Sequence, residues 1–152
     1  MKKLLALFTL FTLAIGISYG QMVLPNQVPT AVKKTFEKSY PAAKDITWEK
    51  ALPYYIATFK KDNVGVIAAF DKSGKWIETT SAFDVRKLPK NIKDKLKSLY
   101  QDAAVQDAVI LETAGAKFYK VKMKRRDRVM DVLLTPEGEV AAYNSPVKYK
   151  GK

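Results

Sequence analysis

Two short segments of the chain hold residues that could do chemistry. In residues 71–74, Asp-Lys-Ser-Gly, a carboxylate, a hydroxyl and a flexible glycine lie between two apolar runs. Clustered oxygen ligands suit Ca²⁺, and a serine beside a base can act as a nucleophile. Further along, Asp127 and Asp131 could approach each other across a hairpin as a pair of acids. The first segment therefore admits three interpretations: a calcium loop, an activated serine or a simple turn.

The composition removes most catalytic chemistry. The chain contains no histidine and no cysteine, which excludes the commonest general base, the thiolate nucleophile and the zinc or haem sites built on them. Ser39 and Ser98 fall on predicted helices, where a hydroxyl is usually solvated. The arginines around Asp127 and Asp131 favour ion pairs over the raised pKa that a catalytic acid needs. We therefore predict a protein that is not an enzyme, with no metal and no cofactor.

The elements that position these residues occur twice in the sequence. Segments 28–43 and 88–104 align with an offset of 60, and each predicts a helix of about three turns that starts at a proline and buries one apolar stripe. Segments 54–76 and 118–140 align with an offset of 64, with matches on every second residue, as strands require. We place the extra four residues between the helix and the strands. The shared register indicates an internal duplication.

This alignment bears on the meaning of residues 71–74. Their counterpart is Thr-Pro-Glu-Gly at 135–138, so Asp71 and Ser73 are replaced and only the glycine is kept. A glycine at the fourth place supplies the positive φ that such a turn requires. Both segments are therefore predicted to be β-turns. A site confined to the first segment remains an alternative.

The predicted fold is α+β, built from tandem α-β-β-β-β units whose helices pack on one face of an antiparallel sheet. We expect a signal peptide at 1–20 and two repeats, 21–84 and 85–152, fused into one domain and joined by residues 81–87. The expected strands are 45–50, 53–60, 64–71 and 75–80, then 105–112, 116–124, 129–135 and 138–143. Trp48 and Trp76 are expected in the core.

The first twenty residues have the pattern of a secretory signal peptide. A basic start is followed by an apolar run and then by small residues before a cut between Gly20 and Gln21. The run of about 14 apolar residues is too short for a bilayer, which needs roughly 20. We predict a periplasmic or secreted protein that does not span the membrane. Loss of two leader lysines changes the net charge from +12 to +10.

The strand period also separates the two faces of the predicted sheet. The face away from the helices is expected to be apolar and aromatic in the first half and a ladder of lysines in the second. A surface of this kind suits a protein or peptide partner in the cell envelope. Curvature or dimerisation that hides the face is the alternative. The candidate partner-binding residues are Tyr54, Ile56, Thr58, Ile67, Phe118, Lys120, Lys122 and Leu133.

A second candidate surface is the basic hairpin at 117–128. Its positive side chains could grip the anionic groups of acidic polysaccharide or lipid headgroups. The alternative is a solvated turn whose charges prevent edge-to-edge pairing of strands. Nucleic acid is not expected as a partner, because the protein is predicted to be exported. The candidate anion-binding residues are Lys120, Lys122, Lys124, Arg125, Arg126 and Arg128.

Several motifs together resemble a known family. They are the proline helix start, Tyr40-Pro41, Trp48, the pattern Tyr-x-Ala-x-Phe at 55–59, Ala-x-Phe-Asp-x-x-Gly-x-Trp at 68–76, and the restart at Leu88-Pro89. In these the chain resembles the PepSY-like, β-lactamase-inhibitor-protein-like (BLIP-like) family of small exported bacterial proteins.

The resemblance implies two α+β units side by side on a joined sheet. It also implies a non-catalytic binding module, of the kind that inhibits a hydrolase or peptidase. Inhibition of β-lactamase itself is not implied, because the inhibitor's contact loops have no match here and its disulfides are missing.

Overall fold

The computed structural model describes residues 20–144 and 147–148, so the predicted signal peptide lies outside the described residues except for Gly20. The first half, residues 21–84, contains β1 (Gln21–Val23), the 3-10 helix η2 (Pro25–Gln27), α1 (Thr30–Ser39), β2 (Lys44–Ala51), β3 (Tyr54–Lys61), β4 (Val64–Asp71) and β5 (Trp76–Phe83). The second half, from residue 85, contains η3 (Val85–Lys87), α2 (Lys90–Leu99), β6 (Ala104–Thr113), β7 (Ala116–Arg125), β8 (Arg128–Leu134), β9 (Val140–Tyr143) and β10 (Val147–Lys148).

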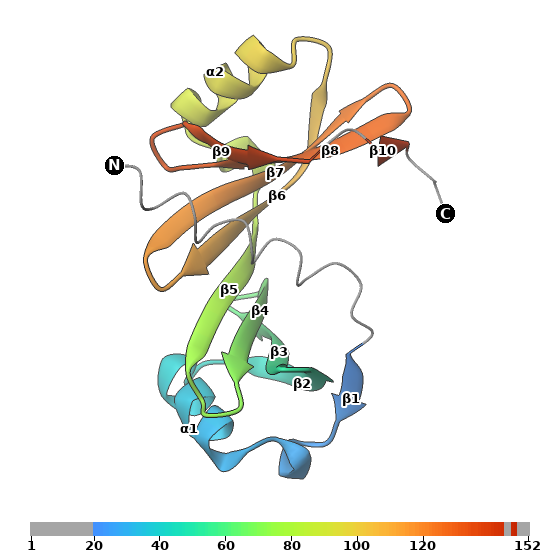
Figure 1. Ribbon diagram of the computed structural model, residues 1–152. Coiled ribbons are helices and arrows are strands. Elements are labelled where there is room, and N and C mark those ends of the chain that lie inside the picture. Colours follow the sequence, from blue (N-terminus) through green and yellow to red (C-terminus); the bar gives the residue numbers. More distant parts are fainter. Residues whose placement is uncertain (1–19, 145–146, 149–152) are drawn as a thin grey trace, which may run out of the picture.

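The strands of both halves join one antiparallel sheet. Its order is β1-β2-β3-β4-β5-β6-β7-β8, and both β9 and β10 pair with β8. Figure 1 shows two lobes, each with one helix, and β5 running from the lower lobe to the strands of the upper one. The predicted α+β class is confirmed, and the predicted helices and strands are present with shifted ends.

Each helix packs through one apolar stripe with a spacing of four residues. Such spacing keeps side chains on one side of a helix, where they can leave water together. The buried sets are Val28, Val32 and Phe36 in the first half and Leu88, Ile92 and Leu96 in the second, none more than 3% exposed. Both prolines lie one position before the helix rather than in its first turn. Their carbonyls accept the first helical hydrogen bonds, from the amides of Lys33 and Lys93.

Both helices lie on the same face of the sheet. Residues that are direct partners across strands share a face. Val66 of the first core is the partner of Ser81, Ser81 is the partner of Ile110, and Ile110 is the partner of Tyr119, which packs on the second core. Among the described residues, no helix therefore lies on the opposite face.

The four-residue difference between the halves lies in a hairpin, so its predicted place between helix and strands was wrong. Trp48 pairs with Ala57, and Ala108 pairs with Val121, so the offset is still 60 on the first strand and becomes 64 only on the second. The loop at 52–53 is replaced by the longer end 112–117 of the β6–β7 hairpin. A hairpin absorbs four residues without a register slip because two more cross-strand pairs form.

The segment predicted as a linker, 81–87, is mostly regular structure. Residues 81–83 complete β5 and pair with 108–110 of β6, and residues 85–87 form η3. The pair Ser81–Ile110 has the same register, offset by 60, as the pair Gln21–Lys50 between β1 and β2. The end of β5 therefore pairs with β6 in the same way as β1 pairs with β2.

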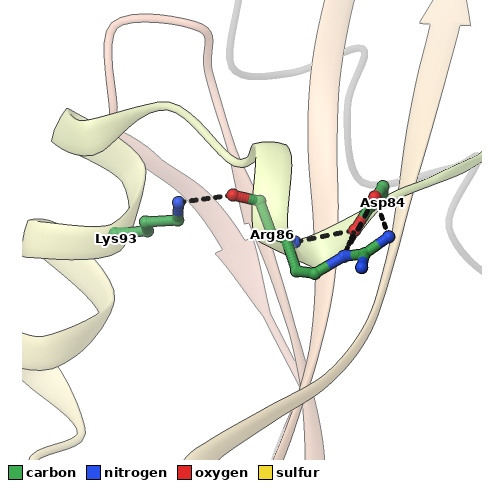
Figure 2. Close-up of polar contacts among 3 residues, drawn as sticks. All are labelled: Asp84, Arg86 and Lys93. Carbon is green, nitrogen blue, oxygen red and sulfur yellow. Dashed lines mark hydrogen bonds and ion pairs between the residues drawn. The ribbon is translucent and has the colours of Figure 1, made fainter.

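A polar clamp fixes the turn into the second helix (Figure 2). Asp84 accepts hydrogen bonds from the backbone amide of Arg86 at 2.9 Å and from its guanidinium at 2.7 Å. These bonds hold the pKa of the Asp84 carboxyl at about 2, below its ordinary value of 3.8. Lys93 of α2 donates to the carbonyl oxygen of Arg86 at 2.7 Å. The first half has Leu24 in place of Asp84 and so lacks this clamp.

Within the part of the chain that the structure describes, neither helix has the length and apolar character needed to cross a membrane.

Candidate functional site

The sheet face opposite the helices, called the open face below, is the candidate binding surface. On every strand, the residues between core positions point to it. All eight predicted partner-binding residues lie on this face and outside both core clusters. They are Tyr54, Ile56 and Thr58 on β3, Ile67 on β4, Phe118, Lys120 and Lys122 on β7, and Leu133 on β8.

The open face is continuous across the junction between the halves. One row of direct partners crosses five strands: Thr58, Ile67, Thr80, Leu111 and Phe118. Thr80 and Leu111 were not predicted as members of this surface, because the pairing of β5 with β6 was not predicted. The apolar run 109–111 was the available signal, since a strand that is apolar on both sides is typical of the middle of a sheet.

The apolar side chains of this face differ in exposure between the two halves. Ile67 in the first half is 44% exposed, but Phe118 and Leu133 in the second are apolar as well and only 6% exposed. Leu111 and Phe118 are direct cross-strand partners. Phe118 and Leu133 are therefore buried in the second half of the face, where Lys120 and Lys122 are the exposed groups of β7.

Acidic neighbours reduce the charge of the lysine ladder. The Nζ atom of Lys120 lies 3.6 Å from a carboxylate oxygen of Asp131. Lys122 stands in register between Asp107 and Asp131. Exposed pairs of this kind stabilise the fold by only about 0–1 kcal/mol, but they cancel much of the local field. The second half of the open face is therefore mixed in charge rather than simply basic.

The six candidate anion-binding residues do not converge on one face. Three of them project from β7 on the side of the open face: Lys120, Lys122 and Lys124. Arg125 points to the other side, and its guanidinium donates to Asp102 at 3.0 Å. Arg128 pairs directly with Arg125 across the hairpin, and Arg126 occupies the turn with a φ of 54°. The structure therefore spreads these charges around the hairpin end.

Among the described residues, Glu78 is the charged residue that is buried, with 4% of its surface exposed. It lies on the open face of β5, in register with Ala69 on one side and Thr113 on the other. Burial raises the pKa of its carboxyl, and the positive charge of Lys120 opposes this only in part. Glu78 was not predicted as a site residue, because a glutamate in a strand is usually exposed.

The segment 71–74 forms the predicted turn. One carboxylate oxygen of Asp71 accepts hydrogen bonds from the amides of Ser73 at 2.8 Å and Lys75 at 3.0 Å, and from the Ser73 hydroxyl. The hydrogen bond from the hydroxyl is the main reason that the pKa of Asp71 is lowered. Gly74 and its counterpart Gly138 have φ values of 86° and 89°. The carboxylate thus serves to close the turn.

The other candidates for chemistry are not brought together. Asp127 is in the turn after β7, whereas Asp131 lies along β8 opposite Lys122, so the two acids do not face each other across the hairpin. Among residues 20–144, no group of three or more acidic side chains is arranged to hold a metal ion.

A hollow between α2 and β9 marks a second surface. In the first half, Trp76 donates its indole N–H to Thr79 at 2.8 Å, and Tyr40 also bonds to that hydroxyl. The counterparts of Trp76 and Thr79 are Val140 and Tyr143, and Tyr143 is 70% exposed. The smaller valine leaves the hollow, which is lined by Lys95, Leu99, Tyr100, Glu137, Gly138, Glu139, Val140 and Tyr143.

The chain, whose sheet is covered by helices on one face and open on the other, also matches a known protein family. The model of the PepSY-like, beta-lactamase-inhibitor-like family matches residues 19–64 and 53–141. The chain belongs to this family. The two matches overlap at 53–64, and together they span both halves. The resemblance inferred from the motifs is thereby confirmed.

Solved structures of three Bacteroides proteins share the fold of this family member. A BLIP-like protein from Bacteroides fragilis is 25% identical, with a TM-score of 0.72 over 85% of this chain and 92% of that one. A DUF2874 family protein from Bacteroides uniformis is 20% identical, with a TM-score of 0.73 over 81% and 92%. A "putative periplasmic" protein from Bacteroides eggerthii is 19% identical, with a TM-score of 0.72 over 80% and 90%. Curated protein sequences gave no match.

Proposed function

We propose that this protein is an exported, non-catalytic binding module that recognises a protein or peptide of the cell envelope through the open face. The observation that carries the proposal is the continuous row from Thr58 to Phe118, which crosses both halves on the face without helices. Ile67 and Leu111 are the apolar members of the row that stay partly exposed, and such groups provide the desolvated centre that protein interfaces need. The family's likeness to a β-lactamase inhibitor supports a hydrolase or peptidase as the partner class.

The same proposal includes export and duplication. The signal-like residues 1–20 and the periplasmic description of the Bacteroides eggerthii protein support a periplasmic or secreted location. The repeated order of elements, the equal registers of the pairs Gln21–Lys50 and Ser81–Ile110, and the double family match support a tandem duplication with a boundary near residue 84.

A substitution on the open face tests the binding role. Ile67→Asp places a charge in the middle of the row, at a side chain that is 44% exposed and therefore able to change without loss of the fold. Val64→Asp is the matched control, because Val64 lies on the same strand, is 39% exposed and has the parity of the core face. Tagged residues 21–152 would be used to capture partners from envelope extract in a high-salt wash. Loss of a captured protein with Ile67→Asp, but not with Val64→Asp, is expected. Equal capture by both variants would contradict the proposal.

The charge distribution favours a second candidate, a binder of polyanions or envelope surfaces. Residues 85–152 hold 16 of the 27 basic residues but only 8 of the 15 acidic ones, so the positive charge is concentrated in the second half. Binding through Lys120, Lys122, Lys124, Arg125, Arg126 and Arg128 would weaken steeply as salt rises. Retention on heparin or on anionic vesicles at low salt, lost when Arg126 and Arg128 are changed to Gln, is the expected result. Binding that does not depend on salt would contradict it.

A further inference from the structure

Glu78 occupies an unusual position for a carboxylate. It lies on β5, a middle strand of the sheet, and on the face without helices. Among the described residues, it is the charged residue that is buried. Burying a charge without a partner costs free energy. A glutamine of nearly the same shape would avoid that cost, so the carboxylate calls for an explanation beyond packing.

The direct cross-strand neighbours of Glu78 on the open face are small residues. On the open face its direct partners are Ala69 on β4 and Thr113 on β6, and the next residue of that face along β5 is Thr80. Beyond Thr113 the row continues with Ala116. The carboxylate therefore stands among small side chains, with larger apolar groups further out.

No hydrogen bond or ion pair to Glu78 is found within residues 20–144. Every fully buried side-chain oxygen described has a hydrogen-bond partner, so the oxygens of Glu78 must still reach the surface of the open face. The closest cationic influence comes from Lys120, whose ammonium already pairs with Asp131. The side chain is thus buried as a whole, its oxygens keep some access to the surface, and no cation among the described residues pairs with it.

We propose that Glu78 receives a lysine or arginine side chain of the partner, while apolar groups beside that residue lie on Ile67 and Leu111. This inference rests on the proposed function, because it assigns the partner's chemistry at the open face. Charge-assisted hydrogen bonds to a carboxylate are about twice as strong as neutral ones. Pairing inside a poorly solvated surface would recover the desolvation cost that the free protein carries.

The basic character of the whole protein makes this contact selective. Without the two leader lysines the net charge is +10, and a chain of this charge repels cationic partners at long range. A partner that presents a single basic residue in an apolar setting would still bind, whereas a broadly basic segment would not. Glu78 then discriminates between partners rather than attracting them.

A displayed library of random peptides, selected on residues 21–152, tests the inference. On the unchanged protein and on the Val64→Asp control, we expect enrichment of peptides with one lysine or arginine next to apolar residues. Glu78→Gln keeps the size of the side chain and removes its charge. The selected peptides should bind this variant roughly ten- to a hundredfold more weakly.

The outcomes separate the two proposals. Enriched apolar peptides without a basic residue, bound equally by Glu78→Gln but not by Ile67→Asp, would overturn the role of Glu78 and leave the open face as the binding surface. Peptides bound equally by Ile67→Asp, or no enrichment at all, would overturn both.

A thermal unfolding measurement distinguishes a binding role from a structural one. Since Glu78 makes no hydrogen bond within the described chain, Glu78→Gln should leave the melting temperature at pH 7 equal or higher. A lower melting temperature would show that the carboxylate holds the fold together, and would overturn the inference.

Discussion

The two halves of the molecule share an order of elements but fill their cores with different chemistry. In the first half, the ring of Phe36 packs against Tyr40, Trp48, Phe59 and Phe70, with centroids 5.1–6.3 Å apart. In the second, Leu96 takes the place of Phe36, and the buried core around it is aliphatic with two methionines, Met123 and Met130. Equivalent positions of the two halves stay apolar while the residue type changes. The fold therefore depends on which places are apolar, and the particular side chains determine how tightly each half is packed.

The halves also differ in how closely the helix approaches the turn before the last strand. A Cβ atom added to Gly74 would lie 2.5 Å from the carbonyl oxygen of Ala31 in α1. At Gly138 the nearest atom would be the side-chain nitrogen of Asn91, at 3.2 Å. The first half is thus closed by backbone against backbone, whereas in the second half the nearest group is the side-chain amide of Asn91, which donates to the carbonyl oxygen of Pro136 at 2.9 Å.

Truncation of the two helix anchors is the strongest test of this comparison. Phe36→Ala should destabilise the protein by about 3–5 kcal/mol, because four aromatic neighbours lose contact around the cavity. Leu96→Ala should cost less, toward the lower end of about 2–5 kcal/mol, because flexible methionines can partly fill the space. Denaturant unfolding of residues 21–152 measures both. An equal or larger loss for Leu96→Ala would show that the aromatic core is not the tighter one.

The glycine turns provide the second test. Both glycines have positive φ, so alanine at either place adds strain of roughly 1–2 kcal/mol. Gly74→Ala should cost clearly more than Gly138→Ala, because only the first substitution drives a methyl group into backbone atoms. Unfolding free energies of the two variants give the comparison. Similar losses would mean that α1 moves away from the turn as easily as the side chain of Asn91 does.

Exchange of the residues before the last strand tests the hollow beside β9. Trp76→Val should lower stability by about 1–3 kcal/mol, since it removes a packed ring and the hydrogen bond to Thr79. Val140→Trp should be neutral or stabilising, because the space between α2 and β9 accepts the larger side chain. Denaturant unfolding checks both. If Val140→Trp is as harmful as Trp76→Val, the hollow is not the counterpart of the indole site.

The smallest expected effect is a change in melting temperature at acidic pH. Because the pKa of Asp84 is lowered from 3.8 to about 2 in the folded chain, its clamp stabilises the fold above pH 3.8 and loses that effect as pH falls toward 2. Asp84→Asn should therefore lower the melting temperature at neutral pH, and the difference from the unchanged protein should vanish near pH 2. The first half has no such clamp, so the matched change Leu24→Asn should show no pH-dependent difference. A constant difference for Asp84→Asn down to pH 2 would contradict the assignment.

The sequence predicted what depends on local period and missed what depends on distant pairing. The apolar stripes of α1 and α2, the turns at Gly74 and Gly138 and the burial of Trp48 follow from spacing of a few residues, and all are found. The pairing of β1 with β2 and of β5 with β6 joins segments 25 or more residues apart. No local pattern specifies such pairs, because their hydrogen bonds form between backbones and not between side chains of a recognisable type.

The candidate surface shows the same limit. Strand parity correctly assigned its eight residues to one face, but parity does not report exposure. Phe118 and Leu133 are covered, whereas Ile67 is not. The junction residues Glu78, Thr80 and Leu111 entered the surface only once the order of the strands was known.

Strand β5 pairs with strands of both halves, so the molecule cannot be cut cleanly into two. β5 is the last strand of the first half, and its final residues also pair with β6 of the second half. If the chain is cut after β5, the second half loses the six residues that pair with β6. If it is cut before β5, the first half loses its last strand. The two lobes should therefore melt in a single cooperative transition, and an attempt to express either alone should yield a chain with an unprotected edge that is prone to aggregate.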